Sequence, residues 1–255
     1  MIESALRLLL IFATPLCLGA QASEFGSPSV DWKESQPVRN ESRAALVLDS
    51  PACMRLRAAV LTKPSPEKET AKLLGVFTKQ NEVGLMVEWL GAEPVTEFKR
   101  TIPPKNGVAR STCRIGTTTV TRTVVCSQTN DAVFIHLIAD HPGVLAFKVS
   151  LAEKNAKIED RRQLILNLPE RPASHIWVLP FESEVTPAGE SIVVRGEGEA
   201  LIIWNFTGQG IPASTISGTL SRLAQRYDPG HLHADPAKIW QAVLAEQMKS
   251  IENSP

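Results

Sequence analysis

Apolar and polar residues along this chain alternate in short runs, and turn residues separate the runs. The clearest run covers residues 117–126, where threonine and valine dominate. β-Branched side chains fit a pleated strand and crowd a helix, so this run predicts a strand. Gly116 separates it from the strand-like run 108–115, and the two runs together predict a hairpin that turns at the glycine.

A second turn, Asp140-His141-Pro142-Gly143, lies between the strand-like runs 133–139 and 144–151. Asp caps a turn with its side chain, Pro fixes φ and Gly tolerates positive φ, so this sequence favours a tight turn. Further strands are predicted at 44–48, 55–61, 83–90, 163–168, 176–181, 191–195 and 200–206. Short strands at this spacing predict a mostly β fold, a large antiparallel β-sandwich of the supersandwich type, rather than a βαβ fold.

The tail of the chain changes to helical spacing. One helix is predicted within 214–227, and a second begins at Asp235-Pro236, with Asp as the N-cap and Pro at the first helical position. The side chains that give the second helix one largely apolar face are Trp240, Val243, Leu244, Gln247, Met248 and Ile251. We therefore expect two C-terminal helices, and the apolar face of the second must be buried against the β domain or against a partner.

The first 22 residues have the features of an export signal. Arg7 precedes the apolar stretch 8–18, and Ala20-Gln21-Ala22 supplies the small residues that a signal peptidase accepts. We therefore expect an exported protein, periplasmic or extracellular, that is not held in a membrane, because no apolar run is long enough to span a bilayer. The predicted organisation is a signal peptide (1–22), a polar linker (23–43), a β-sandwich domain (44–210) and a C-terminal helical segment (211–255).

Charge and cysteine content limit which classes of partner and which disulfide bonds are expected. Lys and Arg together equal Asp and Glu at 27 each, which gives no electrostatic reason to expect nucleic acid or an anionic membrane as a partner. Beyond the signal, Cys113 and Cys126 flank the predicted hairpin, and Cys126 lies opposite about residue 107, too far from Cys113 for a disulfide. Any internal bridge must therefore include Cys53, and three unpaired thiols are the alternative.

An ordered series of short segments between Pro94 and Leu151 resembles the N-terminal β-sandwich domain of glycoside hydrolase family 95, the α-L-fucosidase-like enzymes. The segments are Val95-Thr96-Glu97-Phe98-Lys99-Arg100, Val120-Thr121-Arg122, Val125-Cys126-Ser127, Ala132-Val133-Phe134-Ile135-His136-Leu137 and Ile138-Ala139-Asp140-His141-Pro142-Gly143. A looser match continues at 190–203, and the helix from Asp235 resembles the helix that leads into the family's catalytic barrel.

The sequence also departs from this family. The Gly-rich opening motif of the family is absent between residues 23 and 70. The resemblance places the catalytic groups of the family in a helical barrel that follows the β domain, so no catalytic residue carries over to this chain. We therefore expect no activity from the chain alone; any activity would be that of an α-L-fucosidase-like hydrolase.

Two pairs of carboxylates have a spacing that suits glycoside hydrolysis. Glu182 and Glu184, and likewise Glu197 and Glu199, are two residues apart, and residues with this spacing share one face of a strand. Solvated charge on a loop or strand edge explains both pairs more simply. No catalytic residue is predicted.

The loop between the two predicted helices contains candidate metal ligands. His231 and His233, with Asp228 and Asp235 nearby, are ligand types that zinc accepts. Polar residues are expected in such a loop in any case, so no metal or other cofactor is predicted.

Tryptophan offers the remaining candidate chemistry, because an indole ring packs well against the C–H face of a sugar. Trp177 and Trp204 sit in apolar runs and are assigned to the core, whereas Trp89 follows Glu88 near a strand end and is the candidate for carbohydrate binding. The expected function is a secreted, non-catalytic carbohydrate-associated module with a glycan as partner. The alternatives are the front part of a fucosidase-like hydrolase that needs a separate helical-barrel protein, and a structural or protein-interaction sandwich.

Overall fold

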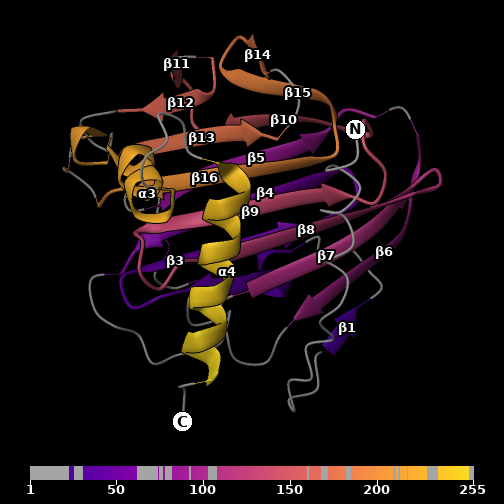
Figure 1. Cartoon of the computed structure of the whole chain (residues 1–255), viewed down its shortest axis with the longest axis horizontal. Helices are drawn as coiled ribbons and strands as arrows, with labels where there is room; N and C mark the ends of the chain where they lie inside the picture. Colours follow the sequence, from indigo (N-terminus) through magenta and orange to yellow (C-terminus); the bar gives the residue numbers. More distant parts are fainter. Residues whose placement is uncertain are drawn as a thin grey trace.

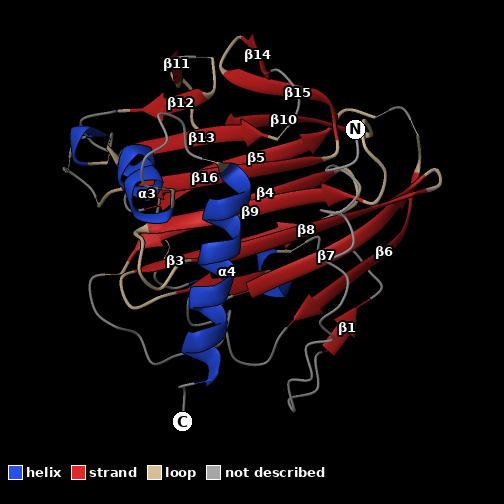
Figure 2. Cartoon of the chain, in the orientation of Figure 1, coloured by secondary structure: helices blue, strands red, loops and turns tan. Residues whose placement is uncertain are grey.

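The computed structural model describes residues 23–25, 31–61, 74, 77, 82–91, 93–102, 108–159, 161–167, 172–181, 185–208, 211, 213–216, 218–228 and 235–252. Within them, two antiparallel sheets face each other and two α-helices lie on one side, as the sequence predicts (Figures 1 and 2). The predicted signal peptide, Glu182, Glu184 and both His231 and His233 lie outside the described residues.

The first sheet has nine strands, in the order β1 (Ser23–Phe25), β6 (Val95–Ile102), β7 (Val108–Ile115), β8 (Thr118–Cys126), β9 (Ala132–Ala139), β16 (Glu199–Phe206), β13 (Ser174–Pro180), β12 (Gln163–Leu166) and β11 (Lys157–Glu159). The second sheet has seven, in the order β14 (Val185–Ala188), β15 (Ser191–Glu197), β10 (Leu145–Leu151), β5 (Glu82–Trp89), β4 (Cys53–Val60), β3 (Arg43–Asp49) and β2 (Gln36–Arg39).

The main core lies between the two sheets. Alternate residues of each strand point inward, so that Ile135 and Trp204 of the first sheet and Phe147 of the second are all fully buried in one cluster. Burying a side chain of this size contributes roughly 1.5–3 kcal/mol relative to leaving it exposed. The alternation that predicted the strands is therefore also what holds the sheets together.

The C-terminal helices cover the outer face of the nine-stranded sheet. Helices α3 (Thr219–Tyr227) and α4 (Pro236–Glu252) bury Leu223, Ile239 and Val243 against that face. The part of the second predicted helix's apolar face that carries Trp240 and Val243 is thus buried against the β domain. Its predicted N-cap is also confirmed, because the Asp235 carboxylate accepts a hydrogen bond of 2.9 Å from the backbone N–H of Ala237.

Residues 23–43 are not a linker where the structure describes them. Ser23–Phe25 pairs with β6, a 3-10 turn η1 (Trp32–Glu34) follows, and Gln36–Arg39 forms the edge strand β2. Strands β11 and β14 were also missed by the sequence pattern. All four strands have three or four residues and lie at sheet edges, where short polar segments complete a ladder without an apolar alternation that would reveal them.

The hairpin at Gly116 has the predicted register. Gly116 adopts φ of 58°, Cys113 pairs with Val120, and Val108 pairs with Val125, which puts Cys126 at the far end of the hairpin from Cys113. Cys53, Cys113 and Cys126, the cysteines among the described residues, are free thiols. Burial raises the pKa of the Cys126 thiol to about 12, so it stays protonated and unreactive.

One buried ion pair joins the two sheets. Arg122 of β8 points into the sandwich and donates to Asp49 of β3 over 2.7 Å, and also to the backbone carbonyls of Ser50 and Pro51. Ser111 of β7 donates to the other oxygen of the Asp49 carboxylate. Burial acts to lower the pKa of Arg122, but the Asp49 carboxylate and the nearby Cys113 and Cys53 together raise it above its usual value, so Arg122 is held as a cation.

Breaking this pair is expected to destabilise the fold strongly. R122M leaves the Asp49 carboxylate buried without its cation and should cost roughly 3–5 kcal/mol in the free energy of unfolding. Adding Asp49→Leu should recover much of that loss. The matched control is R114M, which breaks the exposed Arg114–Glu97 pair on the neighbouring strand and should cost about 0–1 kcal/mol. Urea unfolding followed by tryptophan fluorescence measures all four proteins, and equal losses for R122M and R114M would contradict the role of the pair.

His175 makes the fold sensitive to acid. Its ring stacks on Trp177 with centroids 3.8 Å apart, its Nε2 bonds to Gln163, and its Nδ1 is buried with no hydrogen-bond partner in the described structure. A proton on Nδ1 would be an unpaired buried donor. Burial therefore lowers the pKa of His175 from 6.5 to about 4.

Stability is expected to fall as the pH drops from 6.5 towards 4. Over most of this range the unfolded chain takes up a proton at His175 and the folded chain does not, so the unfolded state is stabilised by about 3 kcal/mol relative to the folded state by pH 4. His175→Gln should remove this part of the pH dependence, whereas the same change at the exposed His141 should leave it intact. Thermal melts between pH 4 and 7 test this, and an unchanged slope in the His175 variant would refute it.

Candidate functional site

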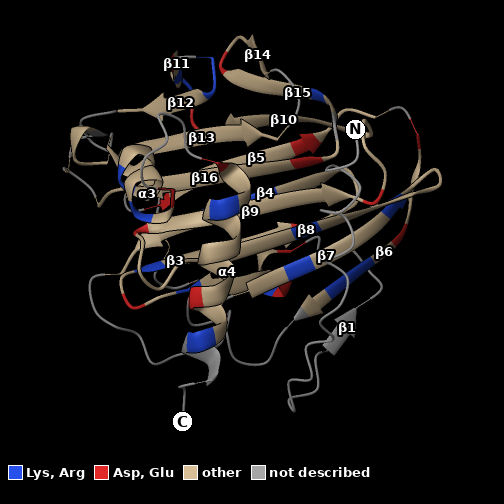
Figure 3. Ribbon diagram, viewed as in Figure 1, with Lys and Arg blue, Asp and Glu red and all other residues tan. Residues whose placement is uncertain are grey.

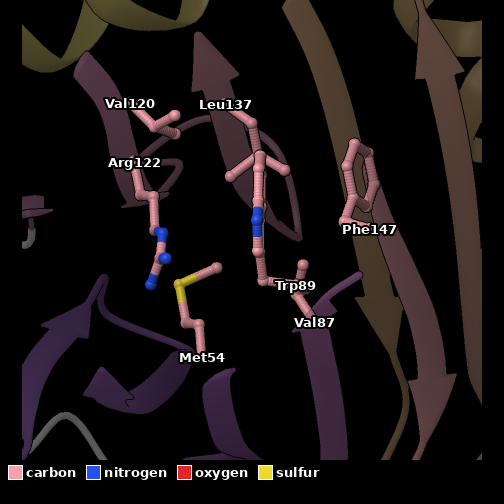
Figure 4. Close-up of a pocket in the computed structure, with 7 residues that line it drawn as sticks. All are labelled: Met54, Val87, Trp89, Val120, Arg122, Leu137 and Phe147. Atoms are coloured by element: carbon pink, nitrogen blue, oxygen red, sulfur yellow. The ribbon is translucent and has the colours of Figure 1, made fainter. Parts of the chain in front are cut away.

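A small cavity lies between the sheets near the end of β5. Its lining residues are Met54, Val87, Trp89, Val120, Arg122, Leu137 and Phe147 (Figure 4). The cavity measures about 10 Å³, which is close to the space that one water molecule needs. It is too small for a sugar.

Trp89, the residue that the sequence singled out, belongs to this cavity. Trp89 pairs with Phe147 across the ladder, and its half-buried ring packs against the core between the sheets. Its Nε1 is buried without a hydrogen-bond partner in the described structure, and a water in the cavity would satisfy it. This geometry favours a packing role for Trp89, and sugar binding there stays a prediction.

A larger groove lies on the outer face of the seven-stranded sheet. It measures about 220 Å³, and its lining residues are Trp32, Arg55, Leu56, Arg57, Glu82, Val83, Gly84, Leu85, Met86, Ala152 and Glu153. Because Leu56 and Leu85 point into the core, the alternation of β4 and β5 turns Arg55, Arg57 and Met86 outward. The side chains that face the groove are therefore a mixture of charged and apolar groups.

Trp32 forms one wall of the groove. The turn η1 carries it over the sheet, where it packs against the outer cluster of Ala44, Leu46 and Phe77 and stays half-buried. The guanidinium of Arg57 lies 5.1 Å from the centre of its ring and forms an ion pair with Glu82. An indole held next to a fixed guanidinium–carboxylate pair presents apolar and hydrogen-bonding surface together.

The floor of the groove depends on Gly84. A Cβ at this position would lie 2.5 Å from the Cβ of Ala152, so only glycine lets the end of β10 approach β5 this closely. The N–H of Gly84 donates to the carboxylate of Glu153 over 3.2 Å. Glu153 is thereby held at the groove, across from the Arg57–Glu82 pair.

The sequence predicted none of these groove residues as a site. Trp32 lies in the segment 23–43, which the sequence predicts to be a linker. Arg57 and Glu82 look like ordinary outward-facing charged residues of strands, and Glu153 looks like an ordinary charged residue of a loop. What brings them together is the pairing of β4 with β5 and of β5 with β10. The one local signal was a tryptophan in an otherwise polar stretch.

The carboxylate pair Glu197 and Glu199 does not share one strand face. Glu197 ends β15 in the seven-stranded sheet, and Glu199 begins β16 in the nine-stranded sheet. Glu199 lies 2.7 Å from Nε2 of His136, whose ring stacks on Trp240 of α4. This carboxylate therefore belongs to the contact between helix and sheet.

Asp228 and Asp235, the two candidate metal ligands that the structure describes, contact other groups of the chain. Asp228 pairs with Lys238 at 2.5 Å, and Asp235 caps α4. Among the described residues there is no cluster of three or more His, Cys, Asp or Glu side chains that suits a metal ion. In the same part of the chain, none of the helices combines the length and the apolar character that crossing a bilayer requires.

Comparison with known proteins assigns no family to this chain. No family model and no curated protein matches the sequence, so the resemblance to glycoside hydrolase family 95 has no support from these comparisons. Among solved structures, the chain is similar to one assigned as a kojibiose phosphorylase from human microbiome, with 10% identity and a TM-score of 0.40. The match covers 84% of this chain and 36% of the other, so this chain spans about a third of the length of that protein.

Proposed function

We propose that this chain is a non-catalytic carbohydrate-binding sandwich domain, and that the groove beside Trp32 is its binding site. The observation that supports this best is the combination of a half-buried indole with two fixed carboxylates and a guanidinium in one open groove. The sequence resemblance over residues 94–151 to the front domain of family 95 glycoside hydrolases points to the same class of ligand. The proposal includes export to the periplasm or the cell exterior, on the evidence of residues 1–22.

The groove offers the two kinds of surface that a sugar ring needs. Trp32 and Met86 provide apolar contact for C–H groups, and Arg57, Glu82 and Glu153 provide donors and acceptors for hydroxyls. At about 220 Å³ the groove is smaller than the pockets of roughly 300–1,000 Å³ that enclose drug-sized ligands. It therefore suits one sugar ring or the end of a chain, bound weakly.

The arrangement of charges supports binding without hydrolysis. Glycoside hydrolysis needs one carboxylic acid that gives up a proton and a second carboxylate that acts as base or nucleophile. Glu82 is paired with Arg57, and Glu153 accepts from a backbone N–H. Both groups are therefore placed as acceptors, which is the role expected in recognition of hydroxyl groups.

A separate catalytic barrel is less well supported. An uncovered apolar face on the last helix was the reason to expect such a partner, and that face lies against the nine-stranded sheet, where Ile239 and Val243 are buried. Among the described residues, no surface supports a protein-interaction role as directly as the groove supports glycan binding.

Removing the indole should weaken glycan binding. Trp32→Ala and E82Q should each lower the affinity for a neutral glycan by roughly tenfold, about 1.4 kcal/mol, because each removes one of the two kinds of contact. The control is Trp89→Phe, which changes the internal cavity and should bind as the parent does. Titration calorimetry or NMR against plant, algal and host glycans at millimolar concentration measures this, with thermal melts to confirm folding.

Two outcomes would count against the proposal. If the parent protein binds none of the glycans, the proposed function is wrong. If it binds one and both groove variants bind it with unchanged affinity, the binding site is not the groove. Hydrolysis of an aryl α-L-fucoside or α-galactoside by this chain alone would overturn the non-catalytic part.

A further inference from the structure

The part of the nine-stranded sheet that the helices leave open has an unusual composition. Three consecutive cross-strand rows of outward residues on β6, β7 and β8 hold nine positions, and each is a threonine or a cation. The rows are Thr101–Arg110–Thr123, Lys99–Thr112–Thr121 and Thr96–Arg114–Thr119. We call these nine residues the threonine–cation face. The next outward row, Val108 and Val125, packs in the cluster under the helices, and Glu97 lies in the β6 bulge beside the rows.

The side chains of this face are accessible. Lys99, Arg110 and Arg114 are exposed, whereas Thr123 is buried where the face reaches His136 beside the helices. Figure 3 shows the Lys and Arg positions along β6 and β7, to one side of α4. Every row therefore offers one solvent-facing cation, which lies between two threonines in two rows and at the β6 end of the row in the third.

Two described acidic residues, Glu97 and Asp140, lie at the rim of the face. Glu97 pairs with Arg114 at 3.0 Å, and Asp140 accepts from the N–H of Thr119 at the hairpin end. Arg114 is the one cation of the face in an ion pair between described residues, so Lys99 and Arg110 are not neutralised by the carboxylates that the structure describes.

The spacing of these groups suits an extended ligand. Neighbouring strands are about 4.8 Å apart and alternate residues along a strand are about 6.7 Å apart, so Lys99 lies roughly 8 Å from each of the two arginines. Threonine hydroxyls both donate and accept hydrogen bonds, as sugar hydroxyls do. A flat, polar, positively charged face of this kind matches a flexible chain of hydroxyl groups with regularly repeated negative charges.

We propose that the threonine–cation face binds an anionic polysaccharide, one whose sugars carry carboxylate or sulfate groups. This site goes beyond the proposed function, because it lies on the outer face of the nine-stranded sheet, and the groove lies on the outer face of the other sheet. Nucleic acid fits the face less well. Single strands bind through stacking on aromatic rings, and none of the nine positions is aromatic.

The test compares two triple variants that remove the same charge. K99Q/R110Q/R114Q removes the cations of the face. K157Q/R161Q/R162Q removes three exposed cations at β11 and β12, the other end of the same sheet.

Affinity electrophoresis of the whole chain in gels with polygalacturonate, dextran sulfate or neutral dextran gives the readout. The parent should be retarded by the two anionic polymers only, the first triple should lose roughly tenfold in affinity, and the second should behave as the parent.

A further variant separates charge from hydroxyl recognition. T112V/T121V keeps all three cations and the strand propensity but removes two hydroxyls, and it should also weaken retardation by polygalacturonate. Thermal melts confirm that each variant is folded.

Several results would overturn the proposal. Equal losses in the two triple variants would mean that only net charge matters, and tighter binding to duplex DNA than to polygalacturonate would assign another ligand. Absence of retardation of the parent protein would also refute it. Trp32→Ala should retain anionic polymer binding, so a failure here is distinguishable from a failure of the groove.

Discussion

The buried pair between Arg122 and Asp49 is the constraint around which this sandwich is arranged. Most contacts between the sheets are apolar and non-directional. Arg122, by contrast, must reach one carboxylate and two backbone carbonyls at hydrogen-bonding distance. Those partners come from Asp49 at the end of β3 and from the turn that leads to β4. The pair thereby fixes how the hairpin of one sheet sits over the other, and a buried charge without its partner is costly enough to enforce that position.

Fixing the sheets in this way leaves two outer faces with different character. On the seven-stranded sheet, the pairing of β4, β5 and β10 gathers Arg57, Glu82 and Glu153 around Trp32. On the nine-stranded sheet, the helices cover the apolar strands β9, β16 and β13 and leave the threonine-rich strands open. The core is thus inert, with thiols and cavity closed to ligands, and both proposed binding surfaces lie on outward-facing residues of strands.

Much of the fold follows from local sequence. The hairpin at Gly116, its register, the central strands and the N-cap at Asp235 all depend on residue properties that act over a few positions. Strands β1, β2, β11 and β14 could not be seen in this way, because their ladders are held by partners distant in sequence. Trp89 illustrates the same limit: its position near a strand end suggested the surface, but its side chain points inward and packs, half-buried, against the core.

The sequence by itself determined that the chain is an antiparallel sandwich with two C-terminal helices, since alternation, turns and helical spacing are local signals. Only the tertiary structure decided where the apolar face of the last helix goes, that Glu197 and Glu199 belong to different sheets, and that Trp32 lies beside Arg57. Each of these depends on which strands become neighbours. Strand order is set by the sum of many long-range contacts, and no short segment encodes it.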